Sequence, residues 1–395
     1  MVHTPSLKRI HNLAPRRLPA VLTIFFFFWT AVCAQSSRLT DDKKPRPFNL
    51  LVLGDSILWG QGLKEEHKAW YLVKNWLQQT TGRDVRGTIE AHAGAVIGSV
   101  EPEPAVMPID DEIGRAWPTI NQQIDAALKS YADPAGVDLV LVDGCINDLD
   151  SRRILNAANT SQSIREYAHA KCGSPVEELL TRIVSSFSSA HVIVTGYFPI
   201  ISDKTPNDLF MRALAKRFYA PEAGAPPLND KQLRARLISI SAEWYRSSNE
   251  ALAAAAANAD LLLKTRGSPQ RVMFAQIPFA PENSFAASQS QLWGFDASAL
   301  RKFLVVITLG KVTLRANDER RSQRVAACKE FYRRPFDETS EQKIIREDHL
   351  VHCRLAAIGH PNKKGAAVYA ESIRQQIRVL INQPGWLRNN PAASR

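Results

Sequence analysis

Short apolar runs alternate with helical patterns along most of this chain. Runs rich in β-branched and other apolar residues, each bounded by turn residues, predict strands at Asn49–Leu53, Val85–Ala91, Val137–Asp143, His191–Thr195 and Arg271–Ala275. The run Leu139–Val142 has no polar position on either face, which is typical of a strand covered by helices on both sides. Strands that alternate with helices predict βαβ units and a mainly parallel sheet.

Apolar residues at helical spacing predict the intervening helices. These lie at Trp70–Leu77, Ile120–Leu128, Val176–Phe187 and 228–263, and a further one passes through Ala366 to Ile377. Two regions are insertions relative to a minimal doubly wound domain, namely Ser202–Pro227 and Pro278–Phe295. Because loops at strand ends hold substrate contacts in such domains, we expect both to be exposed insertions near the site. The run Phe303–Leu314 fits a strand or a buried helix equally well.

The first 34 residues have the pattern of an export signal. Four basic residues precede an apolar run from Leu18 to Val32, which is shorter than the roughly 20 residues that a membrane span needs. Small residues before Gln35 fit a cleavage site, so a secreted or periplasmic protein is expected. An uncleaved N-terminal anchor is the alternative, and only then would the chain contact a membrane. The predicted parts are a signal peptide (1–34), a linker (35–47), one α/β domain (48–385) and a polar tail (386–395).

The net charge suggests an anionic partner at first, but the signal accounts for part of it. The 395-residue chain has 50 Lys and Arg against 39 Asp and Glu, a formal charge of +11, and removal of the signal with its four basic residues leaves +7. That value is a surface property in a chain of this size, so no nucleic-acid partner is expected. With 45% hydrophobic residues, the composition also excludes an intrinsically disordered chain.

Four cysteines remain after the signal: Cys145, Cys172, Cys328 and Cys353. An even number in an exported chain predicts two disulfides. Three pairings are possible, and we favour the one that joins neighbours in the sequence, Cys145 with Cys172 and Cys328 with Cys353. Four buried thiols are the alternative.

The end of the first predicted strand suits a nucleophile. Gly54 and Asp55 allow a tight bend, which would present the Ser56 hydroxyl at the carboxyl edge of the sheet, where open α/β folds keep their sites. Far along the chain, His360 lies in a Gly-His-Pro-Asn loop that precedes a predicted helix. A serine hydroxyl becomes a nucleophile when a base takes its proton, so we expect Ser56 and His360 to meet.

Two further blocks follow predicted strands and offer donors for a negative charge. One strand runs into Gly94, and the next runs into a block that contains Asn147 and Asp148. The backbone N–H groups of Ser56 and Gly94 and the side-chain amide of Asn147 would together suit an oxyanion hole. We expect Asp148, like Gly54 and Asp55, to support the site.

These four blocks, in this order, resemble those of the SGNH hydrolase superfamily, also called the GDSL esterases and lipases. The name-giving residues correspond to Ser56, Gly94, Asn147 and His360, and the resemblance spans roughly 48 to 380. It implies a three-layer α/β/α, flavodoxin-like fold with a five-stranded parallel sheet. It also implies that Ser56 is the acyl-enzyme nucleophile and His360 its base, with no cofactor.

One position departs from the family pattern. The family places an aspartate three residues before the histidine, and Ala357 occupies that position here. Either a backbone carbonyl or water holds the imidazole, or a carboxylate comes from elsewhere, or catalysis is lost. Asp348 is the nearest carboxylate upstream in the sequence. Loss of the orienting acid costs orders of magnitude in rate without abolishing turnover.

Other residues carry weaker expectations. Trp59 follows the nucleophile, and Asn283 and Trp293 lie in the second insertion, so all three are candidates for lining a substrate pocket. The stretch His349–Cys353 contains residue types that bind metals, but no second cluster matches it, and no metal site is expected.

The sequence therefore predicts an exported serine hydrolase that cleaves carboxylic esters of a small molecule, a lipid or a glycan. Two alternatives stay open. One is an acyl or acetyl transferase, or a deacetylase, that acts on envelope or extracellular glycans. The other is a catalytically silent binding module, which the alanine at position 357 favours. The acyl group, the alcohol and the oligomeric state are left undetermined.

Overall fold

The structure is a computed structural model that describes residues 46–98, 110–221, 223–224, 226–296, 314–334 and 337–382. All of them belong to the second of the two units of the chain, Pro45–Arg395. The expected signal peptide, almost all of the linker, the tail 386–395 and the run Phe303–Leu314 except its last residue lie outside the described residues.

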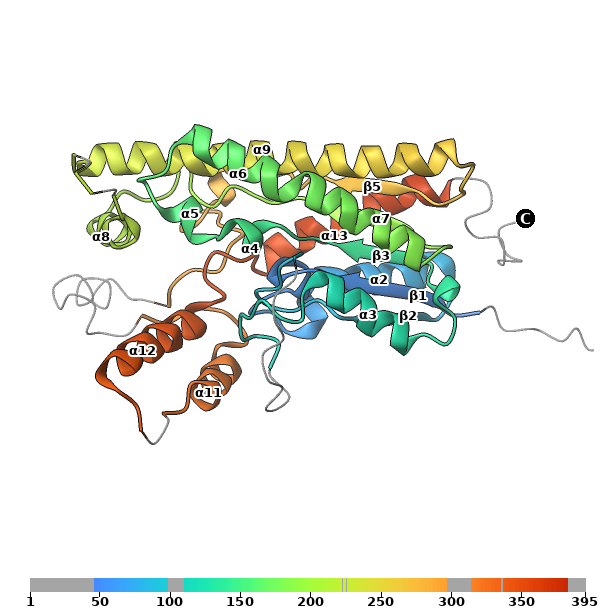
Figure 1. The fold of residues 1–395 in the computed structure, drawn as a ribbon, viewed down its shortest axis with the longest axis horizontal. Coiled ribbons are helices and arrows are strands. Elements are labelled where there is room, and N and C mark those ends of the chain that lie inside the picture. The colour runs from blue at the N-terminus through green and yellow to red at the C-terminus, as the bar shows by residue number, and fades with distance from the viewer. Residues whose placement is uncertain are drawn as a thin grey trace, which may run out of the picture. The chain divides into compact units, whose positions relative to one another are not determined.

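Five parallel strands form one sheet in this unit (Figure 1). The strands are β1 (Phe48–Leu53), β2 (Val85–Ile89), β3 (Leu139–Val142), β4 (His191–Thr195) and β5 (Val272–Ala275). Their order is β2-β1-β3-β4-β5, which is the order of flavodoxin-like domains. In the register, Leu50 of β1 lies opposite Leu139 of β3. The predicted fold class and all five predicted strands are confirmed.

Helices cover both faces of the sheet, as the strand pattern predicts. On one face, α2 (Ala69–Thr81) and α13 (Lys363–Ile381) pack against each other and against the strands. The other face carries α3 (Ile120–Ser130) and α7 (Ser174–Ser186), and α9 (Asp230–Thr265) packs on α7 and β5. In Figure 1, α3 and α7 lie in front of the sheet and α9 runs along the top.

The core lies between these layers. Every residue of β3 is buried, and so is every residue of β4. Each fully buried Val or Leu side chain contributes about 1.5–3 kcal/mol relative to an exposed one. The indole of Trp244, from α9, is fully buried against the ring of Tyr197, with 5.1 Å between ring centroids. Burial on both faces explains why these strands are apolar without alternation.

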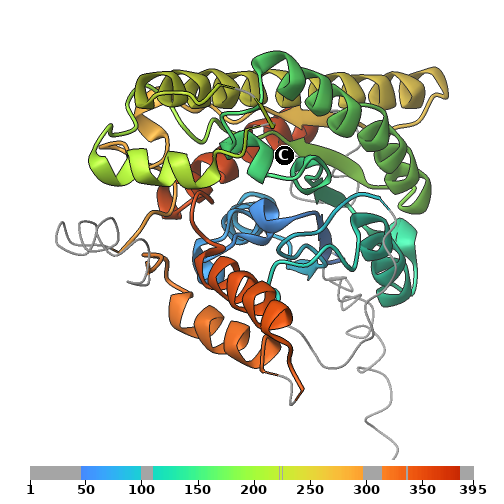
Figure 2. The same ribbon diagram turned by 60° about the vertical axis from the view of Figure 1, so that its left-hand side comes forward.

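The sequence analysis did not predict several helices, of which the longer ones in the described ranges are α6 (Ser161–Cys172), α8 (Leu209–Phe218), α11 (Arg321–Phe331) and α12 (Ser340–Leu355). Helix α8 lies within the first insertion, where Asp208 caps it by accepting a hydrogen bond of 2.8 Å from Met211 N–H. Phe210 of α8 is buried, so this insertion is not wholly exposed as expected. Figure 2 shows α11 and α12 side by side, away from the strands.

Candidate active site

A sharp turn leads from β1 into the short helix α1 (Ser56–Trp59). Gly54 in this turn has a φ of +135°, and a Cβ there would lie 1.8 Å from Asp143 Oδ1, so only glycine fits. The side-chain amide of Gln123 holds the same residue from both sides. Its Oε1 accepts from Gly54 N–H at 2.7 Å, and its Nε2 donates to the Gly54 carbonyl at 3.0 Å. The turn therefore places Ser56 at the carboxyl edge of the sheet.

His360 reaches Ser56 from the other end of the chain. Its Nε2 lies 2.8 Å from Ser56 Oγ, although 304 residues separate the two. The His360 loop pairs with Trp293: the Trp293 N–H donates to the His360 carbonyl at 2.8 Å, and Gly359 N–H donates to the Trp293 carbonyl at 2.9 Å. Asn362 then caps α13. Hydrogen bonds to the backbone of Trp293 and the side-chain cap of Asn362 thus hold the histidine loop.

The other ring nitrogen of His360 has no side-chain partner. His360 Nδ1 is buried and makes no well-formed hydrogen bond within the described part of the chain, and the acceptors that act on the ring are the backbone carbonyls of Ala356, Ala357 and Ile358. Ala357, three residues before it, is fully buried. Asp348 does not supply the missing carboxylate: it is half-exposed on α12, where its Oδ2 lies 3.1 Å from Nδ1 of His352. The suggestion that Asp348 orients His360 is therefore wrong, because α12 directs this carboxylate to another histidine.

The imidazole of His360 is kept neutral by its surroundings. Burial and, next to it, the positive charge of Arg324 lower the pKa of His360, whereas the backbone carbonyls of Ala356, Ala357 and Ile358 raise it, and the resulting pKa is about 4. A neutral imidazole with its proton on Nδ1 can accept the Ser56 proton at Nε2. At neutral pH the pair is therefore in the form that a serine nucleophile requires.

Three hydrogen-bond donors lie around the same cavity as Ser56. Gly94 has a φ of +82°, and a Cβ there would lie 2.5 Å from the backbone N of Arg115. Asn147, on α4 (Ile146–Leu149), donates one amide hydrogen to the Ala95 carbonyl at 2.9 Å and has a second one left. Among the described residues, the backbone N–H groups of Ser56 and Gly94 have no hydrogen-bond partner. These donors suit a developing oxyanion.

Two buried carboxyl groups support the nucleophile turn. Asp55 Oδ1 accepts from Ile57 N–H at 2.8 Å and so caps α1. Asp143, at the end of β3, accepts from Asp55 N–H at 2.7 Å and from Leu58 N–H at 2.9 Å. Burial raises the pKa of both carboxyls, to about 6 for Asp55 and well above the usual range for Asp143. The sequence analysis missed Asp143 as a site residue, although it directly precedes the block of Asn147.

Asp148 and Tyr197 connect the blocks to one another. The carboxylate of Asp148 accepts from Ile97 N–H at 3.1 Å, which fixes the segment after Gly94 beside α4. The Tyr197 hydroxyl donates to Asp55 Oδ2 at 3.0 Å. The expected supporting role of Asp148 thus has a definite contact, whereas nothing in the sequence pattern indicated Tyr197.

The cavity beside Ser56 has a volume of about 830 Å³. Most of its wall is apolar, and the aromatic part comes from Tyr197, Phe198, Phe210, Phe218, Trp244, Phe285 and Phe295. Two of these, Phe285 and Phe295, belong to the second insertion, and two others, Phe210 and Phe218, belong to α8 of the first. The insertions therefore contribute to the site, as expected from their positions.

The three residues predicted to line a pocket do not line this cavity. Trp59 packs under Lys68, whose Nζ lies 3.1 Å from the ring centroid. Asn283 closes a turn, because its Oδ1 accepts from Ala280 N–H at 3.0 Å. Trp293 is buried in a small cluster that includes Ala357. These predictions are wrong because each side chain turns to local packing, which residue type and chain position do not reveal.

Two disulfides join neighbours in the sequence, as favoured above. Cys145 is bonded to Cys172, which ties α4 to α6, and Cys328 is bonded to Cys353, which ties α11 to α12. No group of three or more His, Cys, Asp or Glu in the described ranges could hold a metal ion. Likewise, none of the described helices is long and apolar enough to cross a membrane.

The sheet order and the four blocks at its carboxyl edge are arranged as the SGNH resemblance implies. The fold is thus that of a flavodoxin-like α/β/α domain, and Ser56, Gly94, Asn147 and His360 lie around one cavity in it.

The chain has weak similarity to several solved structures of known proteins. No family model and no curated protein match the chain. Among solved structures, an extracellular lipase from Streptomyces rimosus is 16% identical, with 62% of this chain and 87% of that chain covered and a TM-score of 0.38. Phospholipase A1 from Streptomyces albidoflavus is 12% identical, with 64% and 89% covered and a TM-score of 0.37. A family 3 carbohydrate esterase from Clostridium thermocellum is 16% identical, with 68% and 96% covered and a TM-score of 0.29. At these values the similarity assigns no activity to this chain.

Proposed function

We propose that this protein is an exported serine hydrolase that cleaves carboxylic esters through an acyl-Ser56 intermediate. The observation that carries the proposal is the 2.8 Å contact between Ser56 Oγ and His360 Nε2 at the wall of a cavity. Export is supported by the two disulfides.

In the first half of the reaction, His360 Nε2 takes the hydroxyl proton while Ser56 Oγ attacks the ester carbonyl carbon. The negative charge that forms on the carbonyl oxygen would be stabilised by the N–H groups of Ser56 and Gly94 and by the amide of Asn147. The imidazolium then donates its proton to the departing alcohol oxygen, and an acyl-serine ester is left.

In the second half, His360 Nε2 takes a proton from water, and the hydroxyl oxygen attacks the acyl carbon. The same three donors would stabilise the second oxyanion. When the acyl bond breaks, Ser56 Oγ recovers its proton from the imidazolium, and the carboxylic acid is released. The cycle is balanced, because one water adds across one ester bond.

The apolar wall of the cavity supports an apolar acyl group in the substrate. A pocket of about 830 Å³ is large enough for more than a short acyl chain. We therefore expect kcat/KM to rise with the acyl length of the ester. Each methylene buried from water contributes about 0.8 kcal/mol, so several added carbons would raise kcat/KM by more than tenfold.

The test is hydrolysis of a series of 4-nitrophenyl esters of increasing chain length by wild type, by Ser56→Ala and by Ser151→Ala. Ser151 lines the same cavity but has no contact with His360, so it is the matched control. We expect turnover to vanish in Ser56→Ala and to persist in Ser151→Ala. Undiminished turnover in Ser56→Ala would contradict the proposal.

A silent binding module is the second candidate, because His360 Nδ1 lacks a side-chain partner and Ala357 replaces the usual acid. A fluorophosphonate probe separates the two, since only an activated serine reacts with it. Labelling of wild type that is lost in Ser56→Ala supports the hydrolase. No labelling of correctly folded wild type supports the binding module.

A further inference from the structure

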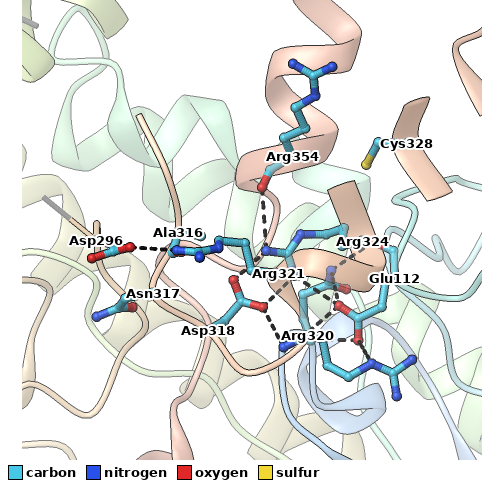
Figure 3. Close-up of polar contacts among 12 residues, drawn as sticks. Glu112, Asp296, Ala316, Asn317, Asp318, Arg320, Arg321, Arg324, Cys328 and Arg354 are labelled. Atoms are coloured by element: carbon cyan, nitrogen blue, oxygen red, sulfur yellow. Dashed lines mark hydrogen bonds and ion pairs between the residues drawn. The ribbon is translucent and has the colours of Figure 1, made fainter. Parts of the chain in front are cut away.

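A buried ion cluster lies beside the active site, and the proposed mechanism does not use it (Figure 3). Arg324, from α11, donates from Nη1 to Glu112 Oε2 at 3.1 Å and to Asp318 Oδ1 at 2.9 Å, and its Nη2 donates to Asp318 Oδ2. The side chains of all three residues are completely buried. Burying charges costs several kcal/mol per ion before their attraction offsets it. Such a cluster therefore calls for an explanation other than simple stability.

On one side, the cluster is connected to the nucleophile. The carboxylate of Glu112 accepts hydrogen bonds of 3.1 Å from Gln61 Nε2 and from Gly62 N–H. Gln61 N–H in turn donates to the backbone carbonyl of Ser56 at 3.0 Å. Glu112 thus holds Gln61 and Gly62, shortly after the end of α1, and through Gln61 the backbone of the nucleophile.

On the other side, the cluster is connected to the base. Asn317, next to Asp318, exchanges two hydrogen bonds with Gly294: its N–H donates to the Gly294 carbonyl at 3.1 Å, and its Oδ1 accepts from Gly294 N–H at 2.9 Å. The preceding Trp293 is bonded to the backbone of His360. Arg324 also faces the carbonyl of Arg354, near the end of α12, at 3.5 Å. The cluster therefore bridges the two loops that carry the reacting groups.

Close packing also joins the nucleophile loop to the histidine loop. A Cβ on Gly62 would lie 2.8 Å from the Cβ of Ala357 and 2.9 Å from the Cβ of Asp318, so these three residues are in direct contact. Ala357 is fully buried there. Ala357 therefore packs against the same segment that Glu112 holds, and it has no space for a larger side chain on the side of Gly62.

We infer that Arg324 is a positioning residue for the Ser56–His360 pair. Its guanidinium, clamped between Glu112 and Asp318, fixes the distance between the nucleophile loop and the histidine loop. In this way it does the orienting work that a carboxylate at position 357 would otherwise do. The inference rests on the proposed function for its effect on rate, but the geometry of His360 reports on it separately.

The positive charge of Arg324 affects the pKa of His360, which a residue with a purely structural role would not do. Burial is the main cause of the lowered pKa of His360, and Arg324 is the next. The other charged groups near the cluster, Lys68 and Arg320, face Glu112. An orienting carboxylate would raise the pKa of His360, whereas Arg324 lowers it. Removing the Arg324 charge should therefore raise the pKa of His360 as well as loosen its position.

The experiment compares three variants of the cluster and one control variant with wild type. Arg324→Lys keeps the charge but loses the two-pronged contact, and Arg324→Met removes both. Because Arg324→Met leaves two buried carboxylates without a cation, it could fail to fold. The triple variant Arg324→Met/Glu112→Gln/Asp318→Asn removes all three charges and avoids this problem. Arg321→Met is the matched control, since Arg321 lies on the same helix and pairs with the exposed Asp296 at 2.6 Å. Circular dichroism selects the folded variants.

We expect kcat to fall about tenfold or more in the folded Arg324 variants, with KM within about twofold of wild type, because a small misplacement of the base affects the chemical step. Arg324→Lys should lose less than the triple variant. In the variants without the charge, the acid limb of kcat/KM should move to higher pH. Arg321→Met should leave both kcat and the acid limb of kcat/KM unchanged. Folded, charge-free variants with wild-type kcat and an unchanged acid limb would overturn the inference.

A measurement on His360 itself separates this inference from the proposed function. Ring nitrogen NMR signals of His360, assigned by their loss in His360→Gln, can be titrated in wild type and in the triple variant whether or not either turns over an ester. A higher His360 pKa and an altered Nδ1 signal in the triple variant support the positioning role, even if Ser56 proves unreactive. Identical titrations contradict it, even if wild type is an active esterase.

Discussion

Asp143 Oδ1 accepts a hydrogen bond of 2.7 Å from the backbone N–H of Asp55, the residue immediately before the nucleophile. Its second oxygen accepts from Leu58 N–H at 2.9 Å, so one carboxyl group at the end of β3 spans the whole nucleophile turn. The contact is tight, because Asp143 Oδ1 also excludes any side chain at Gly54. Asp143, at the end of the neighbouring strand β3, thereby sets the position of Ser56.

Asp143→Asn should lower both stability and turnover. An amide has one acceptor oxygen, so one of the two backbone N–H groups would face a donor instead of an acceptor. Leaving a buried donor without a partner costs about 1–3 kcal/mol. Urea unfolding measures that loss, and kcat should fall with little change in KM. Asp125→Asn, at an exposed ion pair with Arg182, is the control and should leave both unchanged. Wild-type stability in Asp143→Asn would contradict the role given to this carboxyl.

Asn147→Ala should lower kcat by about 100-fold to 1,000-fold, because it removes one donor to the oxyanion. KM should change little, since the donor acts on charge that develops in the transition state. Asn156→Ala is a suitable control: Asn156 caps a turn and does not line the cavity. Steady-state kinetics on a 4-nitrophenyl ester measures both variants. An equal loss of kcat in the two would contradict the assignment of Asn147 to the oxyanion hole.

The acid limb of activity should lie well below neutral pH. Neutral His360 is the active form, and its pKa is lowered to about 4, so kcat/KM should stay flat as the pH falls from 7 to about 5 and decline only below that. A pH profile of kcat/KM measures this limb. An inflection near 6.5, the ordinary value for histidine, would show that His360 is not held neutral.

The two buried histidines should lower stability in the same range. The pKa of His360 and that of His191 are both lowered to about 4, whereas histidines in the unfolded chain titrate near 6.5. Between these values the two histidines bind more protons in the unfolded state, so their contribution to the free energy of unfolding falls as the pH is lowered from about 6.5 towards 4. The raised pKa values of Asp55 and Asp143 act in the opposite direction, so the difference between wild type and His191→Gln in denaturant unfolding at several pH values checks the sign. His191→Gln should weaken this dependence and leave the acid limb of activity in place.

Asp348→Asn should leave kcat and KM within about twofold of wild type, because surface ion pairs contribute little and Asp348 pairs with His352, not with His360. Ester kinetics again provides the measurement. A large loss of kcat in this variant would mean that Asp348 reaches His360 in the working enzyme, and the assignment of a Ser–His pair without a third member would then fail.

Much of the site could be predicted because its parts are local. A glycine after an apolar strand indicates a bend, and a Pro-Asn pair after His360 indicates a loop followed by a capped helix. The end of each parallel strand lies at one edge of the sheet, so Ser56, Gly94 and Asn147 were expected to meet there. Asp143 stood in the same strand-end pattern but was overlooked, because its role is to hold backbone and not to react.

The sequence by itself determined the strands, the fold class, the pairing of neighbouring cysteines as the favoured choice and the order of the four blocks. These follow from periodicity and turn residues, which act over short stretches of chain. Only the tertiary structure decided that Asp348 pairs with His352, that Trp59, Asn283 and Trp293 do not line the cavity, and that Arg324 is buried between Glu112 and Asp318. Such contacts depend on how α11, α12 and the loops pack around the sheet. Glu112 and Arg324 are 212 positions apart, and no local sequence pattern indicates that they are in contact.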